Sequence, residues 1–167
     1  MPFCSRHVGW LFRLEANWSW RSPFAFERDL AFADRTGEVR LILERDGRMT
    51  VTADYAWNGC SPKLCFFDLI VGTPDGVVDP DTGRPKAYHA SLLHDALYQF
   101  LPDGVPLTRA QADRCFLDLL AERGFRLRRI YWAAVRLFGG MVRVVQRGSR
   151  ELDGAAVALE ERGPAPA

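Results

Sequence analysis

The stretch "YHASLLHDALYQF", residues 88–100, decides how this chain folds. Leucine, alanine and phenylalanine recur in it at the spacing of a helical face, which predicts a helix over about residues 86–101. Three polar side chains interrupt the apolar surface: His94, Asp95 and Tyr98. Tyr98 follows His94 by four residues and Asp95 by three, so a helix brings all three to one side. Their partner has to come from another part of the chain.

A second helix supplies a candidate partner. Thr108 and Gln111 stand three residues apart, as in a capping box, and predict a helix start. The apolar stripe expected for this helix consists of Ala110, Phe116, Leu117 and Leu120. Asp113 falls within that stripe and needs a partner, because an unpaired buried charge is costly. A short link makes the two helices antiparallel, so we expect Asp113 within hydrogen-bonding reach of His94 or Tyr98.

Upstream of the helices, the pattern is that of β-strands. In "FRLEANWSW", residues 12–20, apolar and polar residues alternate, which predicts one half-buried strand. The segment "EVRLILERDGRMTVTADYAW", residues 38–57, predicts a hairpin. Its tight turn falls at Asp46-Gly47, a dipeptide that accepts positive φ angles. Residues 58–86 are rich in turn residues and predict a long loop. Within it, the apolar run "CFFDLIV", residues 65–71, is expected either to form a strand or to pack over the core.

A third helix is expected over about residues 127–146. Its predicted core side consists of Ile130, Ala134, Leu137, Met141 and Val144. Arginine recurs every seven residues at positions 129, 136, 143 and 150, a stripe that fits either a solvated face or contact with the phosphates of lipid or nucleic acid. We therefore predict an α+β fold, an N-terminal antiparallel β-sheet followed by three packed α-helices. It forms a single domain of residues 1–150 with a flexible tail over residues 151–167.

Composition narrows the classes of function. The chain has 167 residues and a net charge of +1, so charge alone predicts no nucleic-acid partner. No apolar run is long enough for a transmembrane segment, and the first residues carry no recognisable secretion signal. We expect a protein that is neither exported nor inserted in a membrane.

The His-Asp-Tyr cluster has two interpretations. In the first it is catalytic, with His94 as a base that a carboxylate orients and Asp95 available to a metal ion. In the second it is a buried polar cluster that clamps two helices together. Both remain open on the residues alone.

The order His-Asp-x-x-Tyr, followed by an Asp on an antiparallel helix, resembles the active-site core of secreted and parvovirus-type phospholipases of the A-two class. That resemblance implies that His94 activates water and that Asp113 and Tyr98 support it. It also implies that Asp95 binds Ca²⁺. The further Ca²⁺ ligands are expected from the loop around Asn58, Gly59 and Cys60.

A second resemblance covers about residues 38–140. The hairpin, the turn "NGCSP" at residues 58–62, then "HDALY", "TRAQADRCF" and "IYWAAVRLFGG" are together similar to a family of small proteins encoded by phages and prophages. Members of that family carry Asp where Asn58 stands. The resemblance implies a place in the cytoplasm of a bacterial host or in a virion.

Together the two resemblances predict a phage- or prophage-type protein whose His/Asp site acts as a calcium-assisted ester hydrolase. Its expected partners are phospholipid or other phage proteins. The alternative is a non-catalytic virion or assembly component in which the same residues form a structural clamp. Whether the protein is an enzyme stays open between the two.

Overall fold

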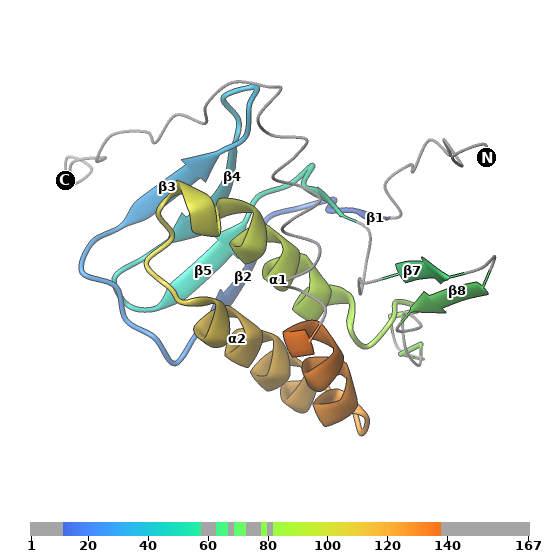
Figure 1. The fold of residues 1–167 in the computed structure, drawn as a ribbon. Coiled ribbons are helices and arrows are strands. Elements are labelled where there is room, and N and C mark those ends of the chain that lie inside the picture. The colour runs from blue at the N-terminus through green and yellow to red at the C-terminus, as the bar shows by residue number, and fades with distance from the viewer. Residues whose placement is uncertain (1–11, 58–62, 67–68, 73–77, 80–81, 138–167) are drawn as a thin grey trace.

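The computed structural model describes residues 12–57, 63–66, 69–72, 78–79 and 82–137. Antiparallel strands fill its N-terminal half and helices its C-terminal part, so the α+β prediction is confirmed (Figure 1). The four-stranded sheet has the order β2-β5-β4-β3, and its members are β2 Trp18–Arg21, β3 Leu30–Ala33, β4 Val39–Leu43 and β5 Arg48–Val51. Two further strand pairs are β1 Phe12–Arg13 with β6 Ala56–Trp57, and β7 Lys63–Phe66 with β8 Leu69–Gly72.

The helices are α1 Tyr88–Phe100, the short 3-10 helix η1 Leu101–Asp103, and α2 Arg109–Glu122. Residues 128–137 are also helical and are called the third helix below. No helix in the described part of the chain is long and apolar enough to cross a membrane. The predicted tail of residues 151–167 and the end of the third helix lie outside the described residues.

The predicted hairpin is present as β4 and β5. Leu41 faces Val51 and Leu43 faces Met49, and all four side chains are fully buried. The turn between the strands uses Gly47 with a φ of 85°, which is the left-handed region that the Asp-Gly dipeptide was expected to supply. Strand alternation therefore sends the large apolar side chains of this hairpin to one face.

The single strand predicted over residues 12–20 is wrong. The structure has two short strands there, β1 and β2, and Ala16 between them is exposed. The cause lies in the facing segment, where Asp54 adopts a φ of 65° and separates β5 from β6. Each half of residues 12–20 then pairs with a different strand, and the side chain of Asn17 accepts a hydrogen bond from the Ala53 amide in the gap.

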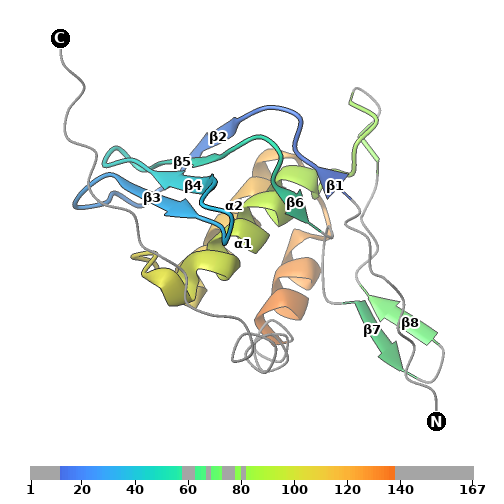
Figure 2. The ribbon, with the colours of Figure 1, turned by 90° about the horizontal axis from the view of Figure 1, so that it is seen from above.

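Within the segment predicted as a loop, residues 58–86, the run of residues 65–71 takes part in β structure, which is one of the two alternatives predicted for it, but in two strands. The segment contains the small hairpin β7–β8, which lies apart from the four-stranded sheet (Figure 2). Val78 and Pro85 form an isolated bridge farther along. The turn residues of this segment therefore flank a pair of strands as well as loop.

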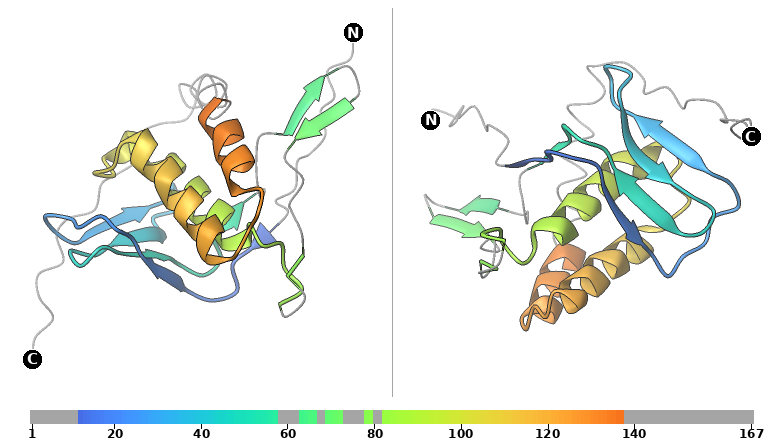
Figure 3. Two further views of the ribbon diagram at one scale, coloured as in Figure 1. Left: turned by 90° about the horizontal axis from the view of Figure 1, so that it is seen from below. Right: turned by 180° about the vertical axis from the view of Figure 1, so that it is seen from behind.

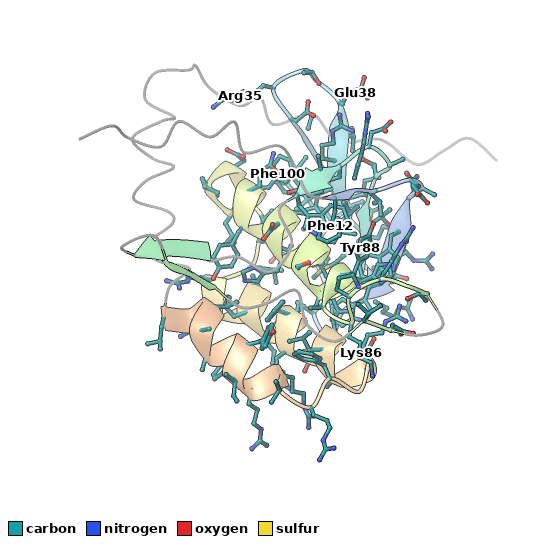
Figure 4. The ribbon with its side chains drawn as sticks, turned by 90° about the vertical axis from the view of Figure 1, so that its right-hand side faces the viewer. Phe12, Arg35, Glu38, Lys86, Tyr88 and Phe100 are labelled. Carbon is teal, nitrogen blue, oxygen red and sulfur yellow. The ribbon has the colours of Figure 1, made fainter. Side chains whose placement is uncertain are left out.

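Helix α1 lies at the centre of the molecule, with the sheet on one side and α2 on the other (Figure 3). Its sequence has no proline, glycine or β-branched residue, so nothing in it opposes a helix. Most of its circumference is buried, which explains why its apolar residues exceed one stripe. At its N-terminal end, Tyr88 packs against Phe12, with ring centroids 5.4 Å apart, while Phe100 packs at the opposite end (Figure 4). The helix thus joins the sheet to the helical layer.

Two predicted helix faces need correction. On α2, Ala110 is exposed and Leu117 is half-buried, although Phe116 and Leu120 are buried as expected. The buried face of α2 consists of Ala112, Asp113, Cys115, Phe116, Leu119 and Leu120. It has this position because, among the named elements, α1 is the main packing partner of α2 and lies along one side of it.

The third helix turns a different side to the core from the predicted one. Ile130 is 64% exposed and Leu137 is 73% exposed, whereas Tyr131 and Val135 are buried. This helix carries apolar residues on two sides, so the helical repeat alone does not say which side meets the core. Met141 and Val144, also placed on the predicted core side, lie outside the described residues.

Gly47 gives a test of the sheet. A Cβ atom at this position would lie 2.4 Å from the carbonyl oxygen of Phe24, in addition to requiring a positive φ. We expect Gly47→Ala to lower the free energy of unfolding by at least about 3 kcal/mol. Gly37→Ala is the matched control, because Gly37 has the same φ of 85° and open space around it, and should cost only about 1 kcal/mol. Urea melts of both variants measure this, and equal losses would show that the close contact is unimportant.

Candidate functional site

The candidate site is built around the carboxylate of Asp113, whose side chain is 0% exposed. His94 Nε2 lies 3.0 Å from Asp113 Oδ1, and the Tyr98 hydroxyl donates to the same oxygen over 2.5 Å. Arg136 donates from Nη1 to the other oxygen, Oδ2, over 3.1 Å. The contact expected between Asp113 and the helix that carries His94 is therefore present. Three different helices converge on one carboxylate.

Local sequence explains how these side chains meet. Helix α1 cannot continue regularly past Pro102, which lacks an amide hydrogen, and the chain reverses through η1. Thr108 then starts α2 with the predicted capping box, its side chain and that of Gln111 each bonding the backbone of the other. Because the reversal is short, α2 runs back along α1. Asp113, one turn into α2, then faces His94.

Two arginines complete the site, and the sequence analysis did not place them there. Arg109 donates from Nε to the Tyr98 hydroxyl over 2.8 Å and from Nη2 to the Arg136 carbonyl over 2.8 Å. The side chain of Arg136, on the third helix, donates to Asp113 as described above. The signal that could have found them is the acceptor capacity of a buried carboxylate, which exceeds what one histidine and one tyrosine can fill. The chain offered Arg109 on α2 itself and Arg136 on the third helix.

The imidazole of His94 packs against two aromatic rings in addition to its hydrogen bond with Asp113. Its centroid lies 4.1 Å from that of the Tyr98 ring and 5.2 Å from that of the Phe116 ring. The whole residue is 8% exposed. With Nε2 bonded to Asp113, the ring can rotate little, and Nδ1 is the nitrogen left for other partners.

Nδ1 faces Asp95. Asp95 Oδ1 lies 3.9 Å from it, too long for a direct hydrogen bond and short enough for one water molecule to contact both atoms. The Asp95 side chain is 29% exposed, in contrast to Asp113. Asp95 therefore sits beside the histidine at the edge of the buried cluster.

The two carboxylates have opposite acidities. Burial raises the pKa of Asp95, and the nearby His94 only partly offsets that rise. Burial acts in the same direction on Asp113, yet hydrogen bonds from His94, Tyr98 and Arg136 outweigh it and hold the pKa of Asp113 below its usual value. Asp113 is thus stabilised as an anion, whereas burial makes the ionised form of Asp95 less favourable.

Burial lowers the pKa of His94, but its hydrogen bond to Asp113 and its interactions with the charges of Asp95 and Asp113 outweigh burial and leave the pKa raised. Burial and its bond to Asp113 raise the pKa of Tyr98, despite Arg109, so Tyr98 stays a neutral donor. The arrangement can hold a proton on His94 and can stabilise the imidazolium that forms when the ring takes one.

The end of β6 approaches α1 one turn before Asp95. Trp57 donates from Nε1 to Ser91 Oγ over 3.2 Å, and the Tyr55 hydroxyl donates to Gln99 Oε1 over 2.9 Å. Burial, and after it the charge of Asp95, raise the pKa of Tyr55. The chain therefore leaves β6 beside the surface that carries Asp95.

Of the expected Ca²⁺ ligands, only Asp95 belongs to the described residues. Asn58, Gly59 and Cys60 lie outside them. Among the described residues, no group of three or more His, Cys, Asp or Glu side chains is arranged to hold a metal ion. A Ca²⁺ site here would need oxygen atoms from the backbone as well as Asp95, as Ca²⁺ sites often have.

Comparisons of the chain with protein-family models, with curated proteins and with solved structures found no match. The resemblances to phage proteins and to phospholipases therefore stay predictions. Function has to be argued from the geometry of the site.

The network around Asp113 gives a stability prediction. Asp113→Asn removes the buried anion and leaves Arg136 and His94 without it, so we expect a loss of about 3 kcal/mol in the free energy of unfolding. Asp118→Asn is the control on the same helix, because Asp118 forms a partly exposed ion pair with Arg114 over 2.8 Å. It should cost less than about 0.5 kcal/mol. Denaturant melts decide, and a small loss for Asp113→Asn would contradict the clamp.

The raised pKa of His94 gives a pH prediction. Its stabilising effect is complete below 6.5, the value of an unperturbed histidine, and is lost as pH rises through the higher pKa of the folded state. We expect the difference in unfolding free energy between the wild type and His94→Gln to fall between about pH 6 and pH 9, by at most about 1.4 kcal/mol per pH unit.

The difference in unfolding free energy between the wild type and His94→Gln removes the contributions of other titrating groups, because these are the same in both proteins. His89, for example, has a pKa lowered to about 4, by burial and then by Arg123 and Arg84, and titrates equally in both proteins. A difference that stays constant with pH would show that His94 is not protonated in the fold.

Proposed function

We propose that His94 and Asp113 form the general-base pair of an ester hydrolase and that Asp95 is a ligand for Ca²⁺. The observation that carries this proposal is the use of the two ring nitrogens. Nε2 is fixed on a buried carboxylate, and Nδ1 is turned to a second, partly exposed carboxylate. A histidine oriented in this way can accept a proton from water at the free nitrogen.

The proposed chemistry follows from these positions. A water molecule between His94 Nδ1 and Asp95 gives its proton to Nδ1 as its oxygen attacks the carbonyl carbon of an ester. Asp113 stabilises the imidazolium without taking the proton, since its pKa is lowered. The C–O bond of the ester then breaks, and the proton on His94 passes to the leaving alkoxide. The products are a carboxylic acid and an alcohol.

Asp95 supports a role for a cation. Its carboxylate has a raised pKa, and no arginine or lysine in the described part of the chain forms an ion pair with it, so a cation would relieve an unfavourable charge. Trp57 at the end of β6 bonds Ser91, which lies one helical turn before Asp95 on α1, and residues 58–60 come next in the sequence. A bound Ca²⁺ would polarise the ester carbonyl. We propose phospholipid as the substrate class and a phage or prophage as the source, both from the resemblances.

Activity gives the test. Wild-type protein should release fatty acid from phospholipid vesicles in Ca²⁺ titrated to about 1 mM or above, because Asn58 offers no carboxylate, and a chelator should stop the release. His94→Gln should lower the rate by about 10² to 10⁴, the usual contribution of a general base. Asp118→Asn should keep the wild-type rate.

Asp95→Asn separates catalysis from folding. Since burial opposes the charge of Asp95, we expect the neutral variant to be at least as stable as the wild type. It should nevertheless lose the hydrolysis and the rise in melting temperature that Ca²⁺ produces in the wild type. Full activity in Asp95→Asn would contradict the proposed role.

A second candidate has its own observation. The complete burial of Asp113, with three donors from the two neighbouring helices, fits a purely structural clamp in a non-catalytic virion or assembly component. In that case the wild type hydrolyses no ester under any Ca²⁺ concentration, and His94→Gln and Asp113→Asn both lower stability strongly. Activity that depends on His94 excludes this alternative.

A further inference from the structure

The outward face of the third helix carries an apolar stripe that nothing in the described structure covers. We define the outer stripe as Leu127, Ile130 and Leu137, which are 50%, 64% and 73% exposed. Within the described residues, only one other large hydrophobic side chain, Val78, is comparably exposed. The helix lies on the side of α1 and α2 that faces away from the sheet (Figure 3). The stripe is therefore a continuous feature of one surface and not a set of scattered residues.

The segment of sequence that carries the stripe has charges of a single sign. Residues 123–150 contain eight arginines and no aspartate or glutamate, although the whole chain has 22 basic and 21 acidic residues. Beside the stripe, Arg126 and Arg129 are exposed, and neither forms an ion pair within the described part of the chain. Arg136, in contrast, is occupied by Asp113. Two free guanidinium groups thus flank an exposed apolar strip.

The third helix cannot simply rotate to bury this stripe. Tyr131 and Val135 fill the buried side, and the Tyr131 ring packs edge-on against Phe125 at 4.8 Å. Arg136 holds the helix to Asp113, while Arg109 binds its backbone at the Arg136 carbonyl. These contacts fix the orientation of the helix. Among the described residues, these contacts therefore keep the stripe on the exposed side of the helix.

We propose that the outer stripe, with Arg126 and Arg129, binds the surface of an anionic phospholipid bilayer. Exposed leucine and isoleucine enter the boundary between headgroups and acyl chains, and the arginines meet lipid phosphates. Charge selects this occupant. A second copy of the chain packed stripe to stripe would bring like charges together, and a nucleic acid would leave the apolar side chains in water. The binding surface goes beyond the hydrolysis proposed above and does not depend on it.

Vesicle sedimentation tests the surface. The full chain is mixed with vesicles of equimolar phosphatidylglycerol and phosphatidylcholine, or of phosphatidylcholine alone, with a chelator present so that no Ca²⁺-dependent step contributes. We expect binding to the anionic vesicles at least about tenfold tighter than to the neutral ones. Raising NaCl from about 0.1 M to about 0.5 M should weaken it, because salt screens exposed charges.

Paired variants locate the contact. Ile130→Ser with Leu137→Ser, and separately Arg126→Glu with Arg129→Glu, should each weaken binding at least about tenfold. Val78→Ser and Arg45→Glu are the matched controls, because they make the same chemical changes at exposed residues elsewhere, and they should change binding less than about twofold. All variants alter exposed side chains, and thermal melts confirm that they fold.

Several outcomes overturn the proposal. One is no binding to anionic vesicles, and another is binding that the controls weaken as much as the stripe variants do. If the wild type instead sediments as an oligomer that Ile130→Ser with Leu137→Ser converts to a monomer, with no vesicle binding, the stripe joins copies of the chain. Binding of duplex DNA or RNA without binding of vesicles would assign the arginines to nucleic acid. Hydrolytic activity is measured separately, so failure of either proposal leaves the other standing.

Discussion

The carboxylate of Asp113 is the constraint on which the helical half of this protein depends. It is removed from water, so its charge must be met by donors within the protein. Helix α1 supplies His94 and Tyr98, and the third helix supplies Arg136. A shift of one helix relative to another would break one or more of these hydrogen bonds. Apolar packing brings the helices together, and the buried anion selects how they fit.

The same contacts suit a catalytic base. A histidine that acts as a base needs a fixed ring, one nitrogen bonded to an anion and the other facing the reacting atoms. The packing of His94 between Tyr98 and Phe116 and its bond to Asp113 meet the first two needs. The third is met by the approach of Nδ1 to Asp95. Structural clamping and general-base chemistry thus demand nearly the same geometry. They are distinguished by whether the protein hydrolyses an ester and by whether Asp95→Asn abolishes that hydrolysis and the stabilisation by Ca²⁺.

Asp95 and Asp113 show how environment separates two identical groups. Both are subject to burial, which raises the pKa of a carboxylic acid. Asp113 has three donors and stays ionised. Asp95 has no donor at hydrogen-bonding distance among the described residues and has a raised pKa. Pairs of carboxyl groups whose surroundings move their pKa values apart are typical of sites that divide chemical roles. Of this pair, only the Asp95 side chain is exposed to solvent, so only Asp95 is open to a ligand.

The sequence by itself determined the elements with strong local signals. The capping box at Thr108, the Asp46-Gly47 turn and the apolar helix of residues 88–100 each follow from chemistry within a few residues. The meeting of His94 with Asp113 was also predictable, because a charge on an apolar stripe needs a partner and the short link left few candidates. These features require no knowledge of distant parts of the chain.

Tertiary structure alone decided the rest. The break between β1 and β2 depends on the left-handed backbone of Asp54 in the facing segment, which no local pattern in residues 12–20 reveals. The third helix has apolar residues on two sides, and its buried side was chosen by packing around Tyr131 and by the reach of Arg136 to Asp113. Periodicity says that a helix has an apolar face, but the partners available in space decide which face is covered.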